Sequence, residues 1–438
     1  MATVSRRAFL NRSALTVAGF TAAASQARRA AAVEAGPVAA NDKLRLALIG
    51  CGGMGRGDLE TFLENPEVDC PLICDVDDAQ LDKAAQAIER LRKGRPERVN
   101  DFRRVMDSRN IDLCLVATPD HWHALPTIHA CQAGKDVYVE KPLATSIAEG
   151  RAMLHAARKA DRVVQMGTQW RSGSHYGDAV DFVQSGKLGK IRLVRMWAAL
   201  TWIEGIGKPA DGVPPSGVDY DMWLGPAKER PFNPARFHFT FRWFWDYAGG
   251  LMTDWGVHLI NIAHWAMRAG MPRSVCSTGG KFVLDDMSQT PDTQVALFEY
   301  PDFTMIWEHQ AVGNHGIRRR EHGVEFLGTA GALVVDANGW EVMPVPGKGL
   351  EPFQAPGTTD AARSRHVRNF LDCVGSRRRP VTDVEIGHQV STIAHLGNVA
   401  LRSGRKIVWD AEKEQASGDS AANEFVAKAY RKPWTLPT

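Results

Sequence analysis

A glycine-rich turn directly after a strand-like segment constrains the fold of this chain more than any other feature of its sequence. Residues 44–49 are an apolar run, and Gly50-Cys51-Gly52-Gly53-Met54-Gly55 follows them with the spacing G-x-G-x-x-G. In a strand–turn–helix unit, the first glycine allows a tight turn, the second lets the backbone approach a pyrophosphate, and the third lets the helix pack on the sheet. The N-terminus of that helix then faces the phosphates. The pattern predicts a Rossmann domain whose dinucleotide-binding turn consists of Gly50, Gly52, Gly53, Met54 and Gly55.

An acidic residue after the next apolar run indicates which dinucleotide is bound. Residues 71–74 are strand-like and end in Asp75, about 25 residues after the glycine-rich turn. A carboxylate there accepts hydrogen bonds from the ribose hydroxyls of the adenosine and disfavours a 2′-phosphate. We therefore expect NAD rather than NADP as the cofactor, with a plain cap of the strand end as the alternative role of Asp75.

Two further apolar runs end in residues that can reach a bound cofactor. Residues 111–117 precede Thr118, and residues 136–139 precede Glu140-Lys141-Pro142, with a helical segment between them. Strands that alternate with helices predict a parallel sheet, and ligands bind at the carboxyl ends of such strands. We expect the Lys141 amine to lie where a nicotinamide ring would lie, which indicates hydride chemistry.

Length and charge indicate a two-domain protein that binds neither nucleic acid nor a membrane surface. The chain has 438 residues and a net charge of +3. We expect a Rossmann domain over residues 42–166 and an α+β domain with a largely antiparallel sheet over residues 167–438. The strand-like runs of the second domain are residues 191–199, 294–300, 304–310, 323–327 and 332–336.

Cysteine spacing and the composition of the C-terminal end complete this outline. The seven cysteines are scattered without C-x-x-C spacing, which predicts buried thiols. Residues 410–424 are charged and rich in serine and alanine, and we expect a surface extension there.

Residues 1–41 predict an export signal and a linker. Arg6 and Arg7 precede an uncharged, mildly apolar run at residues 13–24, a pattern typical of a Tat signal. Small residues at 25–27 offer a cleavage site, and residues 28–41 are an Ala-rich linker. That run is too short to span a bilayer, and no other stretch approaches the ~20 residues needed. We expect periplasmic export with a tightly held cofactor, because no free NAD pool is expected there; a basic, unstructured N-terminus is the alternative.

A predicted helix in the second half carries candidate acid–base residues. Over residues 253–267, helical spacing places Asp254, His258, Asn261 and Trp265 on one face. Asp254 and His258 lie one turn apart, about 6 Å along the axis. A nearby carboxylate raises the proton affinity of an imidazole and orients it, which suits a general base that takes a proton from an alcohol.

The same pair also allows two other interpretations. Asp254 and His258 could ligate a metal together with His121 and His123, or they could be a structural pair. Because no third ligand has a spacing that closes a site around Asp254 and His258, we expect no metal.

Together these motifs resemble the Gfo/Idh/MocA oxidoreductases, which include glucose–fructose oxidoreductase and inositol dehydrogenase. The matching pieces are the glycine-rich turn, residues 118–123, Glu140-Lys141-Pro142, and the D-x-x-x-H of Asp254 and His258. The resemblance implies a Rossmann domain followed by an open-faced α/β domain, with Lys141, Asp254 and His258 as the catalytic trio. It also implies cofactor contacts at the strand ends, for which we expect Thr118, Pro119, His123 and Glu140 beside Lys141.

The resemblance has consequences for export and assembly as well. Glucose–fructose oxidoreductase is exported by Tat with its cofactor bound, which agrees with the predicted signal. Residues 218–226 and 242–247 resemble a Tat-exported bacterial subgroup of the family. Sheet faces of the second domain commonly pair in this family, so we expect a homo-oligomer, either a dimer or a tetramer.

We therefore expect an oxidoreductase that acts on a secondary alcohol of a carbohydrate. His258 takes the hydroxyl proton while the hydride passes to NAD, Lys141 stabilises the developing alkoxide, and Asp254 orients His258. Aromatic faces can stack on sugar rings, and arginines can bind hydroxyls or an acidic group. The expected substrate contacts are Trp170, Arg171, Arg236, His238, Arg242 and Trp243.

Two other functions stay open. The family also includes NAD-dependent glycosidases and lyases, so a redox-neutral glycosidase, lyase or epimerase could act through a transient keto-sugar. Export favours this alternative, because a cofactor that is restored in every cycle needs no external pool. The other is a non-catalytic protein that binds a sugar or the cofactor, against which the intact trio argues.

Overall fold

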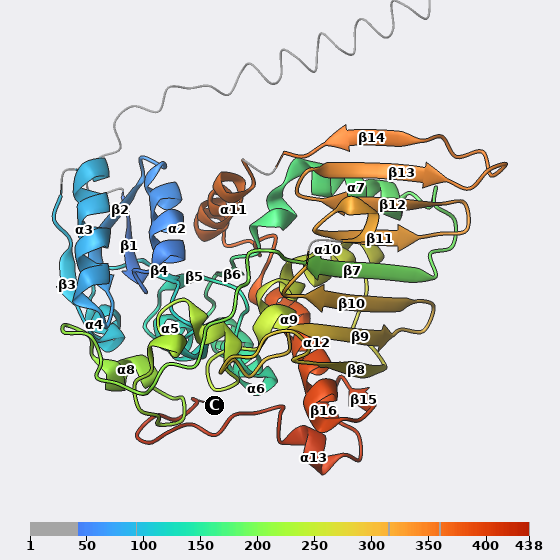
Figure 1. The fold of residues 1–438 in the computed structure, drawn as a ribbon. Helices are drawn as coiled ribbons and strands as arrows, with labels where there is room; N and C mark the ends of the chain where they lie inside the picture. Colours follow the sequence, from blue (N-terminus) through green and yellow to red (C-terminus); the bar gives the residue numbers. More distant parts are fainter. Residues whose placement is uncertain (1–42, 93, 314–315, 359–360, 438) are drawn as a thin grey trace, which may run out of the picture. The chain divides into compact units, whose positions relative to one another are not determined.

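The computed structural model describes residues 43–92, 94–313, 316–358 and 361–437 (Figure 1). The predicted export signal and linker, residues 1–41, lie outside the described residues. Within the described chain, the predicted α/β class and the order of a Rossmann domain followed by an α+β domain are confirmed.

The first sheet is parallel. Its strands are β1 (Leu44–Ile49), β2 (Val68–Cys74), β3 (Glu97–Val99), β4 (Leu113–Val116), β5 (Asp136–Val139) and β6 (Val164–Met166). They lie in the order β3-β2-β1-β4-β5-β6, and each neighbouring pair is parallel. The connecting helices are α2 (Gly53–Leu63), α3 (Asp78–Arg92), α4 (Phe102–Asp107), α5 (Ala124–Gln132) and α6 (Ile147–Lys159), and the short η2 (Asp120–Trp122) follows β4.

The apolar runs form these strands because both faces of the sheet are buried. In β1, Leu46 and Leu48 belong to one hydrophobic core, and Ala47 and Ile49 belong to the other. A strand covered on both faces has a nearly continuous apolar sequence, which made the central strands predictable. The edge strand β3 has the sequence Glu-Arg-Val and is half exposed, so no apolar run indicated it.

The second sheet is largely antiparallel. Its strands are β7 (Leu193–Ala199), β8 (Ser274–Gly280), β9 (Thr293–Glu299), β10 (Thr304–Gln310), β11 (His322–Leu327), β12 (Gly331–Asp336), β13 (Gly339–Pro344), β14 (Phe353–Pro356), β15 (Ile407–Asp410) and β16 (Gln415–Ala416). Their order is β14-β13-β12-β11-β7-β10-β9-β8-β15-β16 (Figure 1). Only the pair of β7 and β10 is parallel among the described strands of this sheet. The five predicted strands match β7, β9, β10, β11 and β12.

Some helices of the second half of the chain cover one face of its sheet, and others pack elsewhere. They are α7 (Ser174–Gln184), α8 (Tyr220–Leu224), α9 (Gly250–Asp254), α10 (Gly256–Met267), α11 (Ala362–Ser376), α12 (Val384–Ser403) and α13 (Ser420–Asn423), with the short η3 (Gln169–Ser172), η4 (Pro234–Arg236), η5 (Thr240–Trp243) and η6 (Ile317–Arg319). Helices α7, α10 and α12 contact the sheet. In β9, Ala296 and Phe298 are buried while Leu297 is exposed, as expected for a sheet with one covered face.

Two predictions about this half need correction. The predicted helix over residues 253–267 is two helices, because the chain bends at Trp255 and Asp254 ends α9. Residues 410–424 are more than a surface extension, since β15 and β16 lengthen the sheet and Ala422 is buried. The chain beyond them packs Trp434 against Trp122 of η2, with ring centroids 4.9 Å apart.

Candidate active site

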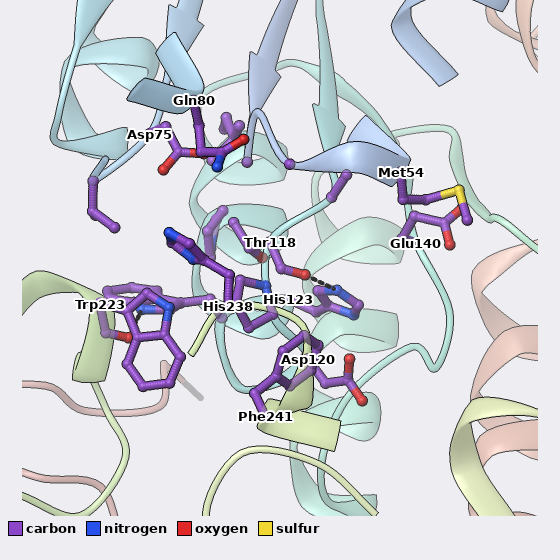
Figure 2. Close-up of a pocket in the computed structure, with 18 of the residues that line it drawn as sticks. Met54, Asp75, Gln80, Thr118, Asp120, His123, Glu140, Trp223, His238 and Phe241 are labelled. Atoms are coloured by element: carbon purple, nitrogen blue, oxygen red, sulfur yellow. Dashed lines mark hydrogen bonds between the residues drawn. The ribbon is translucent and has the colours of Figure 1, made fainter. Parts of the chain in front are cut away.

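The carboxyl ends of β1, β2, β4 and β5 border a cavity of about 470 Å³ (Figure 2). Asp75 and Gln80 lie toward one end of it, and Asp120 and Phe241 toward the other. The structure places most of the predicted cofactor residues on its wall: Gly50, Gly52, Gly53, Met54, Asp75, Thr118, Pro119, His123, Glu140 and Lys141. Gly55 does not line the cavity and instead packs beneath the turn.

The glycine-rich turn has the shape that a pyrophosphate requires. Gly50 has φ +93°, and a Cβ there would lie 2.6 Å from the backbone of Ala117 and Thr118. A Cβ on Gly55 would lie 2.1 Å from the carbonyl oxygen of Gly50. At Gly52 and Gly53 a Cβ would meet no protein atom within 4 Å, because both border open space at the start of α2. The turn therefore leaves room for phosphates at a helix N-terminus.

Asp75 caps the glycine-rich turn and also lines the cavity. Its Oδ2 accepts a hydrogen bond from the Cys51 amide at 2.6 Å, and its Oδ1 accepts one from the Asp77 amide at 3.0 Å. Burial raises the pKa of Asp75 to about 6. The carboxylate also faces the cavity, so its remaining lone pairs are available to ribose hydroxyls.

Lys141, Asp254 and Arg242 form a buried charge cluster at the edge of the cavity. The Lys141 amine donates to Asp254 Oδ1 at 2.6 Å and to the Asp254 carbonyl oxygen at 3.1 Å. Arg242 Nε donates to the same Oδ1 at 3.3 Å. Burial alone would raise the pKa of Asp254, but Lys141 and Arg242 hold it well below its usual range. Asp254 is therefore an ionised partner of two cations.

This cluster corrects the predicted role of Asp254. The sequence suggested that Asp254 orients His258, but its carboxylate bonds to Lys141 and Arg242. The Nδ1 atom of His258 is buried with no hydrogen-bond partner among the described residues. Burial and the nearby Lys141 amine lower the pKa of His258 to about 3, so the imidazole is neutral at neutral pH.

His123 is a structural member of the site. Its ring nitrogens lie 2.9 Å from the Thr118 carbonyl oxygen and 2.7 Å from the Pro142 carbonyl oxygen. The ring thereby joins the segments that follow β4 and β5, and it helps to set the position of Lys141.

Trp170 and Arg171 of η3 do not line the cofactor cavity and instead contact residues of α10. The Trp170 ring is 4.7 Å from the His258 ring and stacks on the His322 ring at 5.2 Å, so His322 joins a group that the sequence did not indicate. Arg171 donates to Asn261 Oδ1 at 2.8 Å and lies over the Trp265 ring at 4.7 Å. Arg171 is therefore already engaged by α10.

The other predicted substrate contacts have separate locations. His238 and Arg242 line the cavity, and His238 Nε2 lies 2.7 Å from Asp77 Oδ2, at the adenosine end that Asp75 marks. Arg236 does not line the cavity and donates to the Pro231 carbonyl oxygen at 3.0 Å. Trp243 belongs to the hydrophobic core. A substrate contact at Trp243 or Arg236 is therefore not supported, because neither side chain reaches the cavity.

Sequence reasoning missed Asp120, which lines the cavity after β4 and is 7% exposed. Burial raises the pKa of Asp120 to about 7, although the positive charges of Arg242 and Lys141 act to lower it. Its place in Thr118-Pro119-Asp120, at a strand end, was the available signal.

Three features of the described chain bear on other kinds of site. Over the described ranges, no group of three or more His, Cys, Asp or Glu side chains is arranged to hold a metal ion. No helix in the described part of the chain is long and apolar enough to cross a membrane. All seven cysteines are free, and all except the partly exposed Cys276 are buried.

Two family models match the chain. One is described as an oxidoreductase family with an NAD-binding Rossmann fold, and it matches residues 44–168. The other is described as the C-terminal alpha/beta domain of the oxidoreductase family, and it matches residues 194–271 and 358–436. The cavity is thus the NAD site of this domain, with the glycine-rich turn at its phosphate end.

Curated relatives and solved structures are similar as well. A glycosyl hydrolase family 109 protein of Shewanella pealeana is 25% identical over 43% of this chain and 44% of its own length. An alpha-N-acetylgalactosaminidase of Shewanella oneidensis is 27% identical over 34% of this chain and 33% of its own length. The match therefore spans less than half of either relative.

The solved structures show the fold. Aldose-aldose oxidoreductase from Caulobacter crescentus, complexed with glycerol, has a TM-score of 0.64 and 21% identity, covering 84% of this chain and 99% of that one. A levoglucosan dehydrogenase in complex with NADH and levoglucosan also has a TM-score of 0.64, with 19% identity over 83% of this chain and 99% of that one.

Proposed function

The chain belongs to the Gfo/Idh/MocA family of oxidoreductases, and on this basis we propose that it transfers a hydride between NAD and a secondary alcohol of a sugar or sugar derivative. The observation that carries this proposal is the ion pair of Lys141 and Asp254 at the edge of the NAD cavity. An ammonium held there can donate a hydrogen bond to an oxygen whose carbon gains or loses a hydride. The levoglucosan bound to one solved neighbour supports a carbohydrate substrate.

Each residue of the trio has a distinct part in this proposal. Bound NAD supplies a hydride acceptor at its nicotinamide ring. Lys141 donates a hydrogen bond to the reacting oxygen and stabilises its developing negative charge. Asp254 holds the Lys141 amine in place and balances its charge. His258 is neutral and offers an imidazole nitrogen to the substrate hydroxyl, and the Trp170 ring lies 4.7 Å from the His258 ring.

A second candidate function is redox-neutral cleavage. Here the sugar is oxidised transiently, and the ketone acidifies the neighbouring C–H bond, so that this proton and the leaving group are eliminated. In a glycosidase water then adds to the double bond, and the hydride returns to the ketone. The glycosyl hydrolase family 109 protein and the alpha-N-acetylgalactosaminidase among the relatives support this reading. The proposed Tat export supports it too, since such a cycle consumes no NAD.

One experiment separates the two functions. Purified protein is incubated with a panel of aldoses and aryl glycosides, without added NAD and with and without EDTA. Continued release of the aglycone indicates the redox-neutral cycle, whereas one burst of NADH per protein indicates net oxidation. If neither occurs with any sugar, even with added NAD, the proposed function is wrong. We expect EDTA to change neither outcome.

We also propose periplasmic export by Tat and assembly into a dimer or tetramer. The twin arginines at positions 6 and 7 support the first, and the exposed Leu297 and Phe353 on the second sheet support the second. Fractionation of cells that express the full chain, and light scattering of the purified protein, test these two proposals.

A further inference from the structure

Asp120 is a buried carboxyl group of the NAD cavity that the proposed mechanism does not use. It lies in η2, directly after β4, and its side chain lines the cavity (Figure 2). No hydrogen bond to its carboxylate is present among the described residues. The other carboxylates of the site differ, since Asp75 accepts two backbone N–H groups and Asp254 accepts Lys141 and Arg242. Asp120 is therefore free to exchange a proton.

The charged groups around Asp120 come from four parts of the chain. They are Arg242 in η5, Lys141 after β5, Asp254 in α9 and Lys428 in the C-terminal segment. Lys141 and Arg242 already share the carboxylate of Asp254. The neighbouring His121 and His123 are neutral, because burial lowers their pKa values to about 3 and about 4. With burial raising the pKa of Asp120 to about 7, this group titrates in the neutral range.

The charge of the bound dinucleotide acts on this titration. The nicotinamide ring is cationic in NAD⁺ and neutral in NADH. A cation nearby favours the ionised carboxylate, so a nicotinamide ring held beside Asp120 would give this group a lower pKa as NAD⁺ than as NADH. Between those two pKa values, reduction of the dinucleotide is accompanied by uptake of one proton.

We propose that Asp120 is the proton store of the hydride-transfer site. Oxidation of R₂CH–OH breaks its C–H and O–H bonds. The hydride with its electron pair goes to NAD⁺, and the proton goes to the Asp120 carboxylate, which leaves R₂C=O, NADH and a neutral Asp120. In the reverse step Asp120 returns the proton as the carbonyl is reduced. This inference rests on the proposed function, and it suits a cycle in which the hydride is returned.

The test needs no sugar. Protein is equilibrated with NAD⁺ and NADH mixtures of known ratio at several pH values, free dinucleotide is removed, and the bound ratio is measured after denaturation. For the wild type we expect the preference for NAD⁺ over NADH to rise with pH around 7, by up to tenfold per pH unit. For Asp120→Asn we expect no pH dependence of this preference.

Asp75→Asn is the matched control, because Asp75 is another carboxyl group that lines the same cavity. We expect it to weaken binding of both dinucleotides and to keep the wild-type slope. A flat wild-type profile, or a slope that persists in Asp120→Asn, overturns the proposal. The pH dependence of this preference could be lost only in Asp120→Asn while the wild type turns over no sugar. That result would support Asp120 as the proton store and refute the proposed function.

Discussion

The Lys141 amine and the Asp254 carboxylate lie 2.6 Å apart, although 113 residues separate them along the chain. Both side chains are only about one-tenth exposed, at 11% and 12%. Lys141 follows a strand of the NAD-binding sheet, and Asp254 ends α9, which lies between β7 and β8 of the second sheet along the chain. Removal of Asp254 leaves the Lys141 and Arg242 charges without this shared counter-charge, and removal of Lys141 leaves Arg242 as the remaining ionic partner of Asp254, which makes the pair a sensitive point for activity.

Lys141→Met should lower turnover by a factor on the order of 10²–10⁴, as expected for loss of a positioned proton or hydrogen-bond donor. The fold should persist, because Arg242 still pairs with Asp254. Steady-state kinetics and circular dichroism check this, with Lys159→Met on the exposed side of α6 as the control. Turnover close to that of the wild type would show that Lys141 does not act on the substrate.

Asp254→Asn should reduce turnover about as strongly as Lys141→Met, since the amide cannot balance two cations. If the two residues act as a unit, the double variant should lose little more than either single variant. Steady-state kinetics on the wild type, the two single variants and the double variant give the coupling energy between Lys141 and Asp254. Independent, additive losses would mean that Asp254 acts through another group, such as His258.

Asp75→Asn should relax the preference for NAD over NADP. The amide oxygen can still accept the Cys51 N–H bond, while the negative charge that repels a 2′-phosphate is gone. Two unit charges about 4 Å apart interact by roughly 1–4 kcal/mol near a protein surface, so the ratio of the two dissociation constants should change about fivefold or more. Competition binding with both dinucleotides measures it, and an unchanged ratio would assign the discrimination elsewhere.

The protein should purify with NAD(H) already bound. Residues 218–242 reach the adenosine end of the cavity, where the Asp219 amide donates to the Val76 carbonyl oxygen at 2.8 Å and His238 contacts Asp77. Denaturation and chromatography of the released molecules check this. His238→Ala should lower the retained fraction after dialysis, whereas the exposed Glu229→Gln should not. Freshly folded protein that releases no dinucleotide would contradict tight binding.

Gly225→Ala should destabilise the fold by at least about 2 kcal/mol, through left-handed backbone strain and overpacking. Gly225 has φ +49°, and a Cβ there would lie 2.0 Å from the Trp122 ring. Urea unfolding measures the change. Gly212→Ala is the control from the same connection, because a Cβ on Gly212 meets no atom within 4 Å. Equal stability of the two variants would refute the close contact at Trp122.

Several parts of this site could be predicted because they depend on neighbours along the chain. The turn at Gly50 needs glycine for its own backbone conformation, and the buried strand before Lys141 has a continuous apolar sequence. A parallel sheet brings the ends of such strands to one edge. The sequence by itself therefore determined the Rossmann domain, the place of the NAD cavity and the presence of Lys141 beside it.

Only the tertiary structure decided which charges meet there. Helical spacing suggested Asp254 as the partner of His258. In the structure the helix is interrupted at Trp255, and the Asp254 carboxylate accepts hydrogen bonds from Lys141 and Arg242. Asp120 has a neutral-range pKa only because other segments bury it. Trp243 became core for the same reason. The burial and the ionic partners of these side chains come from contacts between residues far apart in the chain, and local sequence patterns do not predict such contacts.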